Sequence, residues 1–157
     1  MTTPDDRAAA WGQRLIEIHD WLRDDLARVR EELAGGPSRL GTDIRAHCVA
    51  FCSTVHQHHD GEDGMMLPAL AEHAPELAPT LAKIAEDHRL VADVLVRLDA
   101  LLSGTGPDTD ADELALVRGE VDGLAAILES HFAYEERTIV AALDALPPGA
   151  LGPPGQG

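Results

Sequence analysis

Residues 58–70 read HHDGEDGMMLPAL and contain a histidine and a glutamate four positions apart, His58 and Glu62. Residues with this spacing on an α-helix lie about 40° apart around its axis and about one turn apart along it. The imidazole and the carboxylate can therefore point the same way. Together they could hold one metal ion.

The same spacing returns in the second half of the chain at His131 and Glu135. The residues that follow each glutamate also correspond, EDGMMLPAL from Glu62 and EERTIVAAL from Glu135. One more histidine precedes each copy, His19 the first and His88 the second. The chain thus has two halves of the same form, and two half-sites that face each other would make one dinuclear centre.

Composition limits the fold class and the partners. The chain has 157 residues, enough for one domain with its own core, and only 3% aromatic residues among many helix formers. A net charge of −16 argues against nucleic acid or an anionic membrane as a partner. No apolar run approaches the roughly 20 residues that span a bilayer, and no signal peptide is visible. The two cysteines, Cys48 and Cys52, are one turn apart and a poor basis for disulfides, so we expect a cytoplasmic protein.

Apolar residues recur every three or four positions in four segments, which predicts four amphipathic helices. The helices are expected from Asp5 to Ala34, from Ser38 to Gly64 or Pro68, from Pro79 to Leu102, and from Leu114 to Pro147-Pro148. Residues 71–79 are expected as a connection or a short helical turn, and residues 103–112 as a polar loop. The sequence therefore predicts an all-α, antiparallel up-down-up-down four-helix bundle over residues 1–146, with a disordered Gly/Pro-rich tail over residues 147–157.

Six polar residues fall on the apolar faces of these helices: His19, His58, Glu62, His88, His131 and Glu135. A single histidine on such a face is more often a hydrogen-bonded core residue than a ligand, but the six together favour a metal. Burying a carboxylate without a partner costs several kcal/mol. None of the 12 Lys and Arg residues falls on the same faces, so a bound metal would supply the missing positive charge.

The residue types indicate which kind of metal centre this is. Ferritin-like di-iron bundles use Glu-x-x-His, which this chain does not contain. Structural zinc sites are closed and often use cysteines, but Cys48 and Cys52 lie two to three turns from His58. A set of nitrogen and oxygen ligands in which the carboxylates can bridge two ions suits iron. It suits manganese less well, because imidazole is a better match to iron.

At this point the sequence resembles a known family. The segments HDWLRDDL, HHDGEDGMMLPAL, EDHRLV and HFAYEERTIVAAL together resemble a hemerythrin-like domain of the HHE cation-binding family, over roughly residues 10 to 145. The resemblance implies two iron ions in a four-helix bundle, joined by a solvent-derived oxo or hydroxo group. It assigns His19 and His58 to one iron, His88 and His131 to the other, and Glu62 and Glu135 as bridges.

One position departs from the oxygen-carrying members of the family. Those proteins carry His-x-x-x-His on the third helix, whereas Ile84 and Ala92 stand four residues before and after His88 here. Without a fifth histidine, both irons would keep an open or water-filled position. We therefore expect O2 to oxidise the reduced irons irreversibly rather than to be carried.

Other residues near the expected centre have several possible roles. Tyr134 could be a ligand, a hydrogen-bond donor, a redox relay or a packing residue. His59 is expected at the surface, although His59 or Asp63 could reach a metal. His47 is expected as a hydrogen-bonded core histidine, with an accessory role near the centre as the alternative, and Cys48 and Cys52 as small buried hydrophobic residues. Trp11 and Trp21 are expected to pack at the bundle edge, Met65 and Met66 to fill gaps beneath the bundle end, and His56 and His73 to be exposed.

The sequence leaves three functions open. The leading one is a redox-active di-iron protein that reacts with O2, peroxide (H2O2) or nitric oxide (NO) and has an electron donor as a possible partner. The second is a module that binds or senses O2 or iron without turnover. The third is a di-iron oxygenase that acts on a small organic substrate. No acid–base dyad or nucleophile is visible, so any enzymatic chemistry would belong to the metals.

Overall fold

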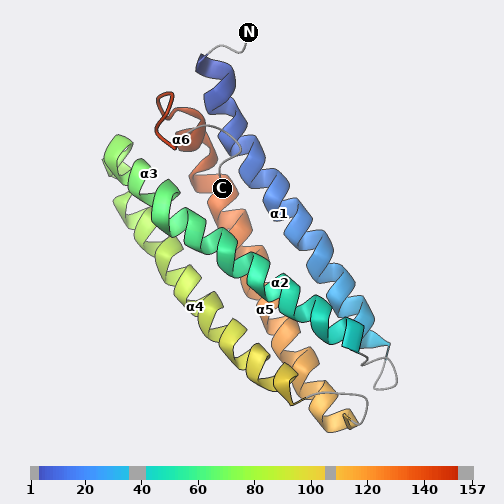
Figure 1. The fold of residues 1–157 in the computed structure, drawn as a ribbon. Coiled ribbons are helices and arrows are strands. Elements are labelled where there is room, and N and C mark those ends of the chain that lie inside the picture. Colours follow the sequence, from blue (N-terminus) through green and yellow to red (C-terminus); the bar gives the residue numbers. More distant parts are fainter. Residues whose placement is uncertain (1–3, 36–41, 105–108, 152–157) are drawn as a thin grey trace.

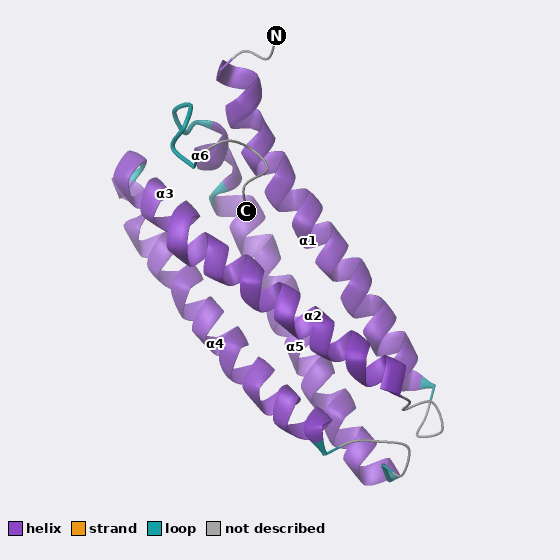
Figure 2. Ribbon diagram, in the orientation of Figure 1, coloured by secondary structure: helices purple, strands orange, loops and turns teal. Residues whose placement is uncertain are grey.

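The computed structural model describes residues 4–35, 42–104 and 109–151, and the regular secondary structure in these ranges is entirely helical (Figure 2). The elements are α1 (Pro4–Ala34), α2 (Thr42–Gly61), the π-helical turn η2 (Glu62–Met66), α3 (Leu67–His73), the 3-10 turn η3 (Pro75–Leu77), α4 (Ala78–Ser103), α5 (Ala111–Thr138) and α6 (Val140–Asp144). The predicted start of the second helix near Ser38 lies outside the described residues. None of the described helices is both long enough and apolar enough to cross a bilayer.

These elements form four rods: α1, then α2 with η2 and α3, then α4, then α5 with α6. Consecutive rods run in opposite directions (Figure 1). α1 and α4 each pack against α2 and α5. The all-α bundle predicted from the helical spacing of apolar residues is therefore confirmed.

The second rod does not end where the sequence predicts. Helical structure continues past Gly64 and Pro68 as far as His73. In the π turn, the Leu67 N–H donates to the Glu62 carbonyl five residues earlier. Pro68 comes next, in the first turn of α3, where a residue without an N–H is tolerated. The π turn thus allows a proline to follow without ending the rod.

The fourth rod also differs from the prediction of one helix that runs to Pro147-Pro148. α5 ends at Thr138, and Ile139 interrupts the rod before α6. The Thr138 hydroxyl donates to the Tyr134 carbonyl at 2.7 Å. A side chain that bonds the carbonyl four residues back often bends a helix, which accounts for a break at this point.

α6 lies against the N-terminal part of α1 because Gly12 permits a close approach. The Gly12 N–H donates to Asp144 Oδ1 at 3.1 Å. A Cβ atom at this position would lie 2.4 Å from the same oxygen and 2.9 Å from Val140 Cγ1. The turn after α6 continues this packing, since Leu151 is buried, whereas the sequence predicts disorder from Pro147 onward. Residues 152–157 lie outside the described residues.

Among the described residues, the apolar core consists of two separate clusters. The first apolar cluster includes Leu22, Val55, Val91, Leu124 and Phe132, and the second includes Leu15, Leu70, Ile84, Ile139 and Leu143. On α4, Ile84 belongs to the second cluster and Val91 to the first, with buried His88 between them. α1 and the fourth rod likewise carry residues of both clusters with a buried histidine between them. A buried polar layer therefore crosses the bundle between the two apolar clusters.

The buried face of the second rod differs from the predicted one at two positions, where Cys48 and His59 are buried in place of His47 and His58. The sequence predicts an inward face through His47, Phe51, Val55, His58 and Glu62, whereas the buried residues are Cys48, Phe51, Val55, His59, Glu62 and Met66. Both series keep the helical spacing of three and four. The packing of α2 between α1 and α4 selects the second series and places His47 and His58 at its α1 side.

His47 joins α2 to α1 through two carboxylates. Its Nε2 lies 2.7 Å from Asp25 Oδ1, and its Nδ1 lies 3.1 Å from Glu32 Oε2. Because each ring nitrogen faces a carboxylate, the doubly protonated imidazolium can donate to both. The hydrogen bond to Asp25 raises the pKa of His47, partial burial opposes it, and Glu32 raises it further. His47 is thus a half-buried ion-pair residue rather than the core residue that the sequence predicts.

We expect His47→Gln to destabilise the metal-free protein more at pH 6 than at pH 9. The folded-state pKa of His47 lies above its unfolded value of 6.5. Its stabilisation is therefore fully present below about 6.5 and is lost as the pH rises through the folded-state value. Urea unfolding of the variant and wild type at both pH values measures the difference, with the exposed His73→Gln as control. Equal losses at the two pH values would contradict the ion pair.

Candidate metal centre

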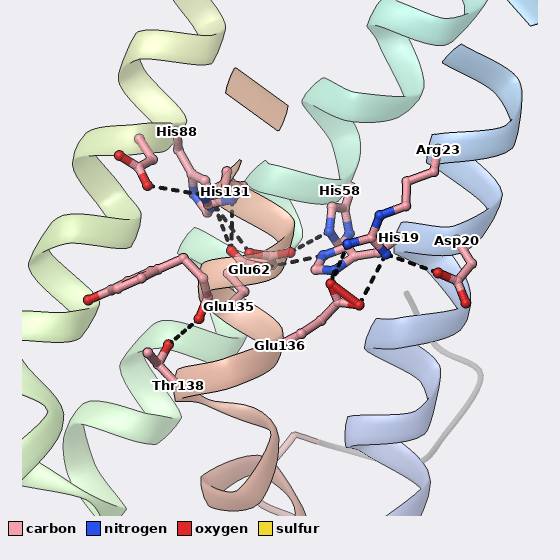
Figure 3. A network of polar contacts seen from close by, with 12 residues as sticks. His19, Asp20, Arg23, His58, Glu62, His88, His131, Glu135, Glu136 and Thr138 are labelled. Carbon is pink, nitrogen blue, oxygen red and sulfur yellow. Dashed lines mark hydrogen bonds and ion pairs between the residues drawn. The ribbon is translucent and has the colours of Figure 1, made fainter. Parts of the chain in front are cut away.

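The polar layer collects histidine and glutamate side chains from every rod. α1 supplies His19, α2 supplies His58 and His59, η2 supplies Glu62, α4 supplies His88, and α5 supplies His131 and Glu135. In Figure 3, Glu62 and Glu135 lie between His88 and His131 on one side and His19 and His58 on the other. The structure thus brings together the six residues predicted from the sequence, while their binding of a metal stays a prediction.

One set of donors, here called the His19 half, consists of His19, His58, Glu62 and Glu135. One ligand atom from each lies within 4.8 Å of the others. His19 Nε2 is 3.1 Å from Glu135 Oε2, and His58 Nε2 contacts the Glu62 carboxylate. The ring of Phe132 stacks on His19 with 4.2 Å between centroids, which restricts rotation of the imidazole.

The second set, here called the His88 half, shares both glutamates. Donor atoms of Glu62, His88, His131 and Glu135 also lie within 4.8 Å of one another. His88 Nε2 is 3.2 Å from Glu62 Oε2 and 3.3 Å from Glu135 Oε1, and His131 Nε2 is 2.9 Å from Glu135 Oε1. Since each carboxylate belongs to both halves, the two glutamates stand where bridging ligands would be needed.

His59 joins the His88 half, and the prediction that it lies at the surface is wrong. Its side chain is buried with 4% exposure, and its ring stacks on His88 with 4.0 Å between centroids. The ring of His131 lies 5.1 Å away in an edge-on arrangement. Ligand atoms of His59, His88 and His131 lie within 4.8 Å of one another. A fifth histidine is therefore present, and α2 rather than the third helical rod supplies it.

The sequence does contain a signal for His59. Cys48, Phe51, Val55, His59 and Met66 share one helical face, and that face is as apolar as the one through His58. His58 and His59 are about 100° apart around the helix, so each can face a different neighbour. His58 lies beside His19 of α1, with 5.3 Å between ring centroids, whereas His59 stacks on α4.

The hydrogen-bonding state of the layer fits a missing cation. In the described part of the chain, the buried side-chain nitrogen and oxygen atoms without a hydrogen-bond partner all belong to this layer: both ring nitrogens of His19, Nε2 of His58, His59 and His131, both carboxylate oxygens of Glu62, and Oε2 of Glu135. Buried polar groups are normally paired. Within each half, these atoms lie close together without hydrogen-bond geometry, and one ligand atom from each residue is within 4.8 Å of the others, as in a metal site. The residues present therefore fit bound metal.

The protonation of these groups supports the same conclusion. Burial lowers the pKa of His59 to about 2, with further lowering from His88 and His131, so its ring is neutral and can donate a lone pair. Burial opposes the charged form of His88, but its contacts with Glu135, Glu62 and Asp63 outweigh burial and raise its pKa to about 10. Burial alone would raise the pKa of Glu135, yet three histidines hold it well below its usual range. Glu135 is therefore ionised within the layer, and a positive charge is needed beside it.

A second ring of carboxylates contacts the outer nitrogens of the histidines. Asp63 Oδ1 lies 2.7 Å from Nδ1 of His88, and Asp87 Oδ2 lies 3.3 Å from Nδ1 of His131. Asp63 thus contacts a predicted ligand instead of joining the metal donors itself. Sequence reasoning did not identify Asp87, because its position one residue before His88 gives no sign that it reaches α5.

Tyr134 lies in α5, one residue before Glu135. Its ring packs against the second apolar cluster, with Lys83 Nζ 4.8 Å and Arg137 Cζ 5.7 Å from its centroid. This arrangement favours the packing role among those considered from the sequence. His56, by contrast, is exposed as predicted, at 61%, and pairs with Asp60.

The cysteines lie in the first apolar cluster rather than in the polar layer. Burial raises the pKa of Cys48 to about 11 and that of Cys52 to about 12. Both therefore stay as neutral thiols near neutral pH, and thiols are poor metal ligands compared with thiolates. The tryptophans differ from each other: Trp11 packs against the second apolar cluster, whereas Trp21 is 51% exposed.

Comparison with known proteins agrees with the fold and the layer. The family model described as hemerythrin HHE cation binding domain matches residues 13–143. The chain therefore belongs to the hemerythrin HHE cation-binding family. No curated protein and no solved structure matches the chain.

We expect His59→Ala to weaken metal binding in the His88 half, whereas His56→Ala should leave it unchanged. Loss of a direct donor should cost more than the roughly 10- to 100-fold typical for loss of an outer partner. Competition between the protein and a chelator for Fe²⁺ or Co²⁺ measures this, with thermal melts of the metal-free forms to check folding. Equal affinities of His59→Ala and His56→Ala would show that His59 is only a packing residue.

Proposed function

We propose that the chain is a non-haem di-iron protein that is redox-active toward O2, peroxide or nitric oxide. The observation that carries this proposal is the convergence of four histidines on two shared, buried glutamates, with a fifth histidine, His59, beside His88 and His131, and with donor atoms that lack hydrogen-bond partners. Nitrogen and oxygen donors without thiolates favour iron over zinc, and the number of imidazoles favours iron over manganese. The family match supports cation binding in general.

The donor groups suggest how two ions would be held. His19 and His58 would bind one ion, and His59, His88 and His131 the other, with Glu62 and Glu135 common to both. Each ion would then have either four or five protein donors of the roughly six that octahedral coordination uses. The His19 half therefore leaves more room for a small molecule than the His88 half does.

Bound iron would supply electron exchange with O2, peroxide or nitric oxide, and the chain would control access and water. Apolar clusters close the layer on both sides along the bundle axis. His19, His131 and Glu135 are each at most 1% exposed. Such a dry site strengthens electrostatic interactions within it and limits side reactions.

His59 favours a second candidate function, reversible binding of O2 without turnover. From the sequence, oxygen carriage was disfavoured because a fifth histidine was missing at Ile84 and Ala92. His59 now offers a third imidazole to the His88 half, so the numbers of donors on the two halves differ. Because of this difference, an added ligand such as O2 would prefer the half with fewer protein donors.

Purified with iron, the chain should bind two iron ions, and Glu62→Ala combined with Glu135→Ala should abolish the pair. The metal-free form should melt at a lower temperature, because an ion that binds only the folded state stabilises it by mass action. Metal analysis and thermal melts measure both effects, with Glu76→Ala, an exposed glutamate, as the control. One tightly bound zinc without affinity for iron would contradict the proposal.

The reaction with O2 separates the two candidate functions. We expect O2 to oxidise the reduced iron-loaded protein, and to oxidise His59→Ala faster because both halves then have only two histidines. The visible spectrum is followed after O2 is added and again after the gas is removed. Full return of the reduced wild-type spectrum would replace the redox function by reversible O2 binding. Equal rates for the variant and wild type would show that His59 does not limit access.

A further inference from the structure

Three histidines of the polar layer have the same orientation. Nε2 of His19, His88 and His131 faces the shared glutamates, and Nδ1 faces an outer carboxylate from another part of the chain. His88 contacts Asp63 at 2.7 Å and His131 contacts Asp87 at 3.3 Å. On the other side, His19 Nδ1 lies 3.7 Å from Glu136 Oε2. The contacts of His88 and His131 are hydrogen bonds, whereas His19 Nδ1 has no hydrogen-bond partner. An Nδ1–H that donates outward leaves the Nε2 lone pair directed inward.

In the His19 half, Arg23 pairs with the outer carboxylate, which belongs to Glu136. Arg23 donates to both oxygens of Glu136, from Nη1 at 3.0 Å and from Nη2 at 2.5 Å. Hydrogen bonds to Glu136 are the main reason that the pKa of Arg23 is raised, so the guanidinium stays charged. Arg23 also pairs with Asp20 and Glu129, which fixes its position on the surface of the bundle. Two-point pairing of this kind is geometrically specific.

The outer carboxylates of the His88 half are less neutralised. Asp63 pairs with no lysine or arginine among the described residues, and its partner is His88. Asp87 pairs with Lys83 at 3.2 Å, but the Lys83 side chain is 51% exposed, where solvent screens the pair. The His88 half thus has two outer carboxylates against one exposed cation, and the His19 half has one outer carboxylate held by Arg23.

The π turn explains why Asp63 can reach His88. Glu62 and Asp63 open η2, and the widened turn directs Glu62 into the layer while Asp63 stays at its edge, 45% exposed. Insertions of this type are frequent at functional sites. A histidine that donates to a carboxylate is a stronger electron donor to a metal than one that donates to a neutral or neutralised group.

We propose that Asp63 and Asp87, opposed by the Arg23–Glu136 pair, make the two halves electrostatically unequal, so that the His88 half stabilises the more highly charged ion. Asp63 and Asp87 are positioning residues that act through His88 and His131. This inference rests on the proposed two-iron centre. With two irons bound, an external one-electron reductant would therefore reduce the ion in the His19 half first and the ion in the His88 half second.

Asp63→Asn tests the inference, because asparagine keeps the shape and an acceptor oxygen but removes the charge. Asp60→Asn is the matched control, since Asp60 is also exposed, lies one turn earlier and removes the same net charge. Potentiometric titration of the iron-loaded proteins measures the two one-electron steps. Asp63→Asn should favour the second reduction at least about tenfold, which is about 59 mV for one electron, with a smaller effect on the first. Asp60→Asn should shift neither step by as much.

Arg23→Gln provides the opposite test in the other half. With the charge of Glu136 exposed to His19, this variant should disfavour the first reduction and change the second less. If the protein binds two irons but Asp63→Asn shifts both reduction steps equally, the inequality is overturned and the proposed function stays intact. The same holds if Asp63→Asn and Asp60→Asn shift the steps equally. Failure of the wild-type chain to bind two irons would overturn both.

Discussion

The burial of two carboxylates at the centre of the bundle is the constraint on which the other features depend. Glu62 and Glu135 are 4% and 0% exposed, and an unpaired buried carboxylate costs several kcal/mol. Histidines from α1, α2, α4 and α5 surround them, so every rod contributes to the compensation. The need to gather these partners at one height fixes the relative positions of the rods along the bundle axis. It also explains why the apolar core is divided in two.

The sequence was sufficient to predict the bundle and six members of the polar layer, because both follow from helical spacing. Apolar residues every three or four positions define which side of a helix is buried, and His19, His88 and His131 lie directly on those series. Local spacing could not decide the face of α2. His58 and His59 lie on equally apolar series, and only the packing of α2 between two neighbours shows that both histidines reach the layer.

The helix boundaries show a second limit of sequence reasoning. Glycine and proline at positions 64 and 68 are ordinary signals for the end of a helix, yet the π turn carries the rod through them. A π turn depends on tertiary packing, and no residue pattern in this chain indicates it. Asp87 was missed, and Asp63 was considered only as a possible metal ligand, for a related reason: their partners lie on other rods, and acidic residues are common on the surface of a chain with 28 of them.

The division of the core by a polar layer has a consequence for how the protein opens. Two parts of a protein unfold cooperatively only when they are in continuous contact. Where that contact is weak, each part often unfolds locally as a separate unit. Without metal, the two apolar clusters meet through a layer that contains unpartnered buried atoms. Each end of the bundle can then exchange its amide hydrogens with solvent on its own timescale. Ligation across the layer would merge the two ends into one cooperative unit, so the cations would set the folding unit of the protein as well as its chemistry.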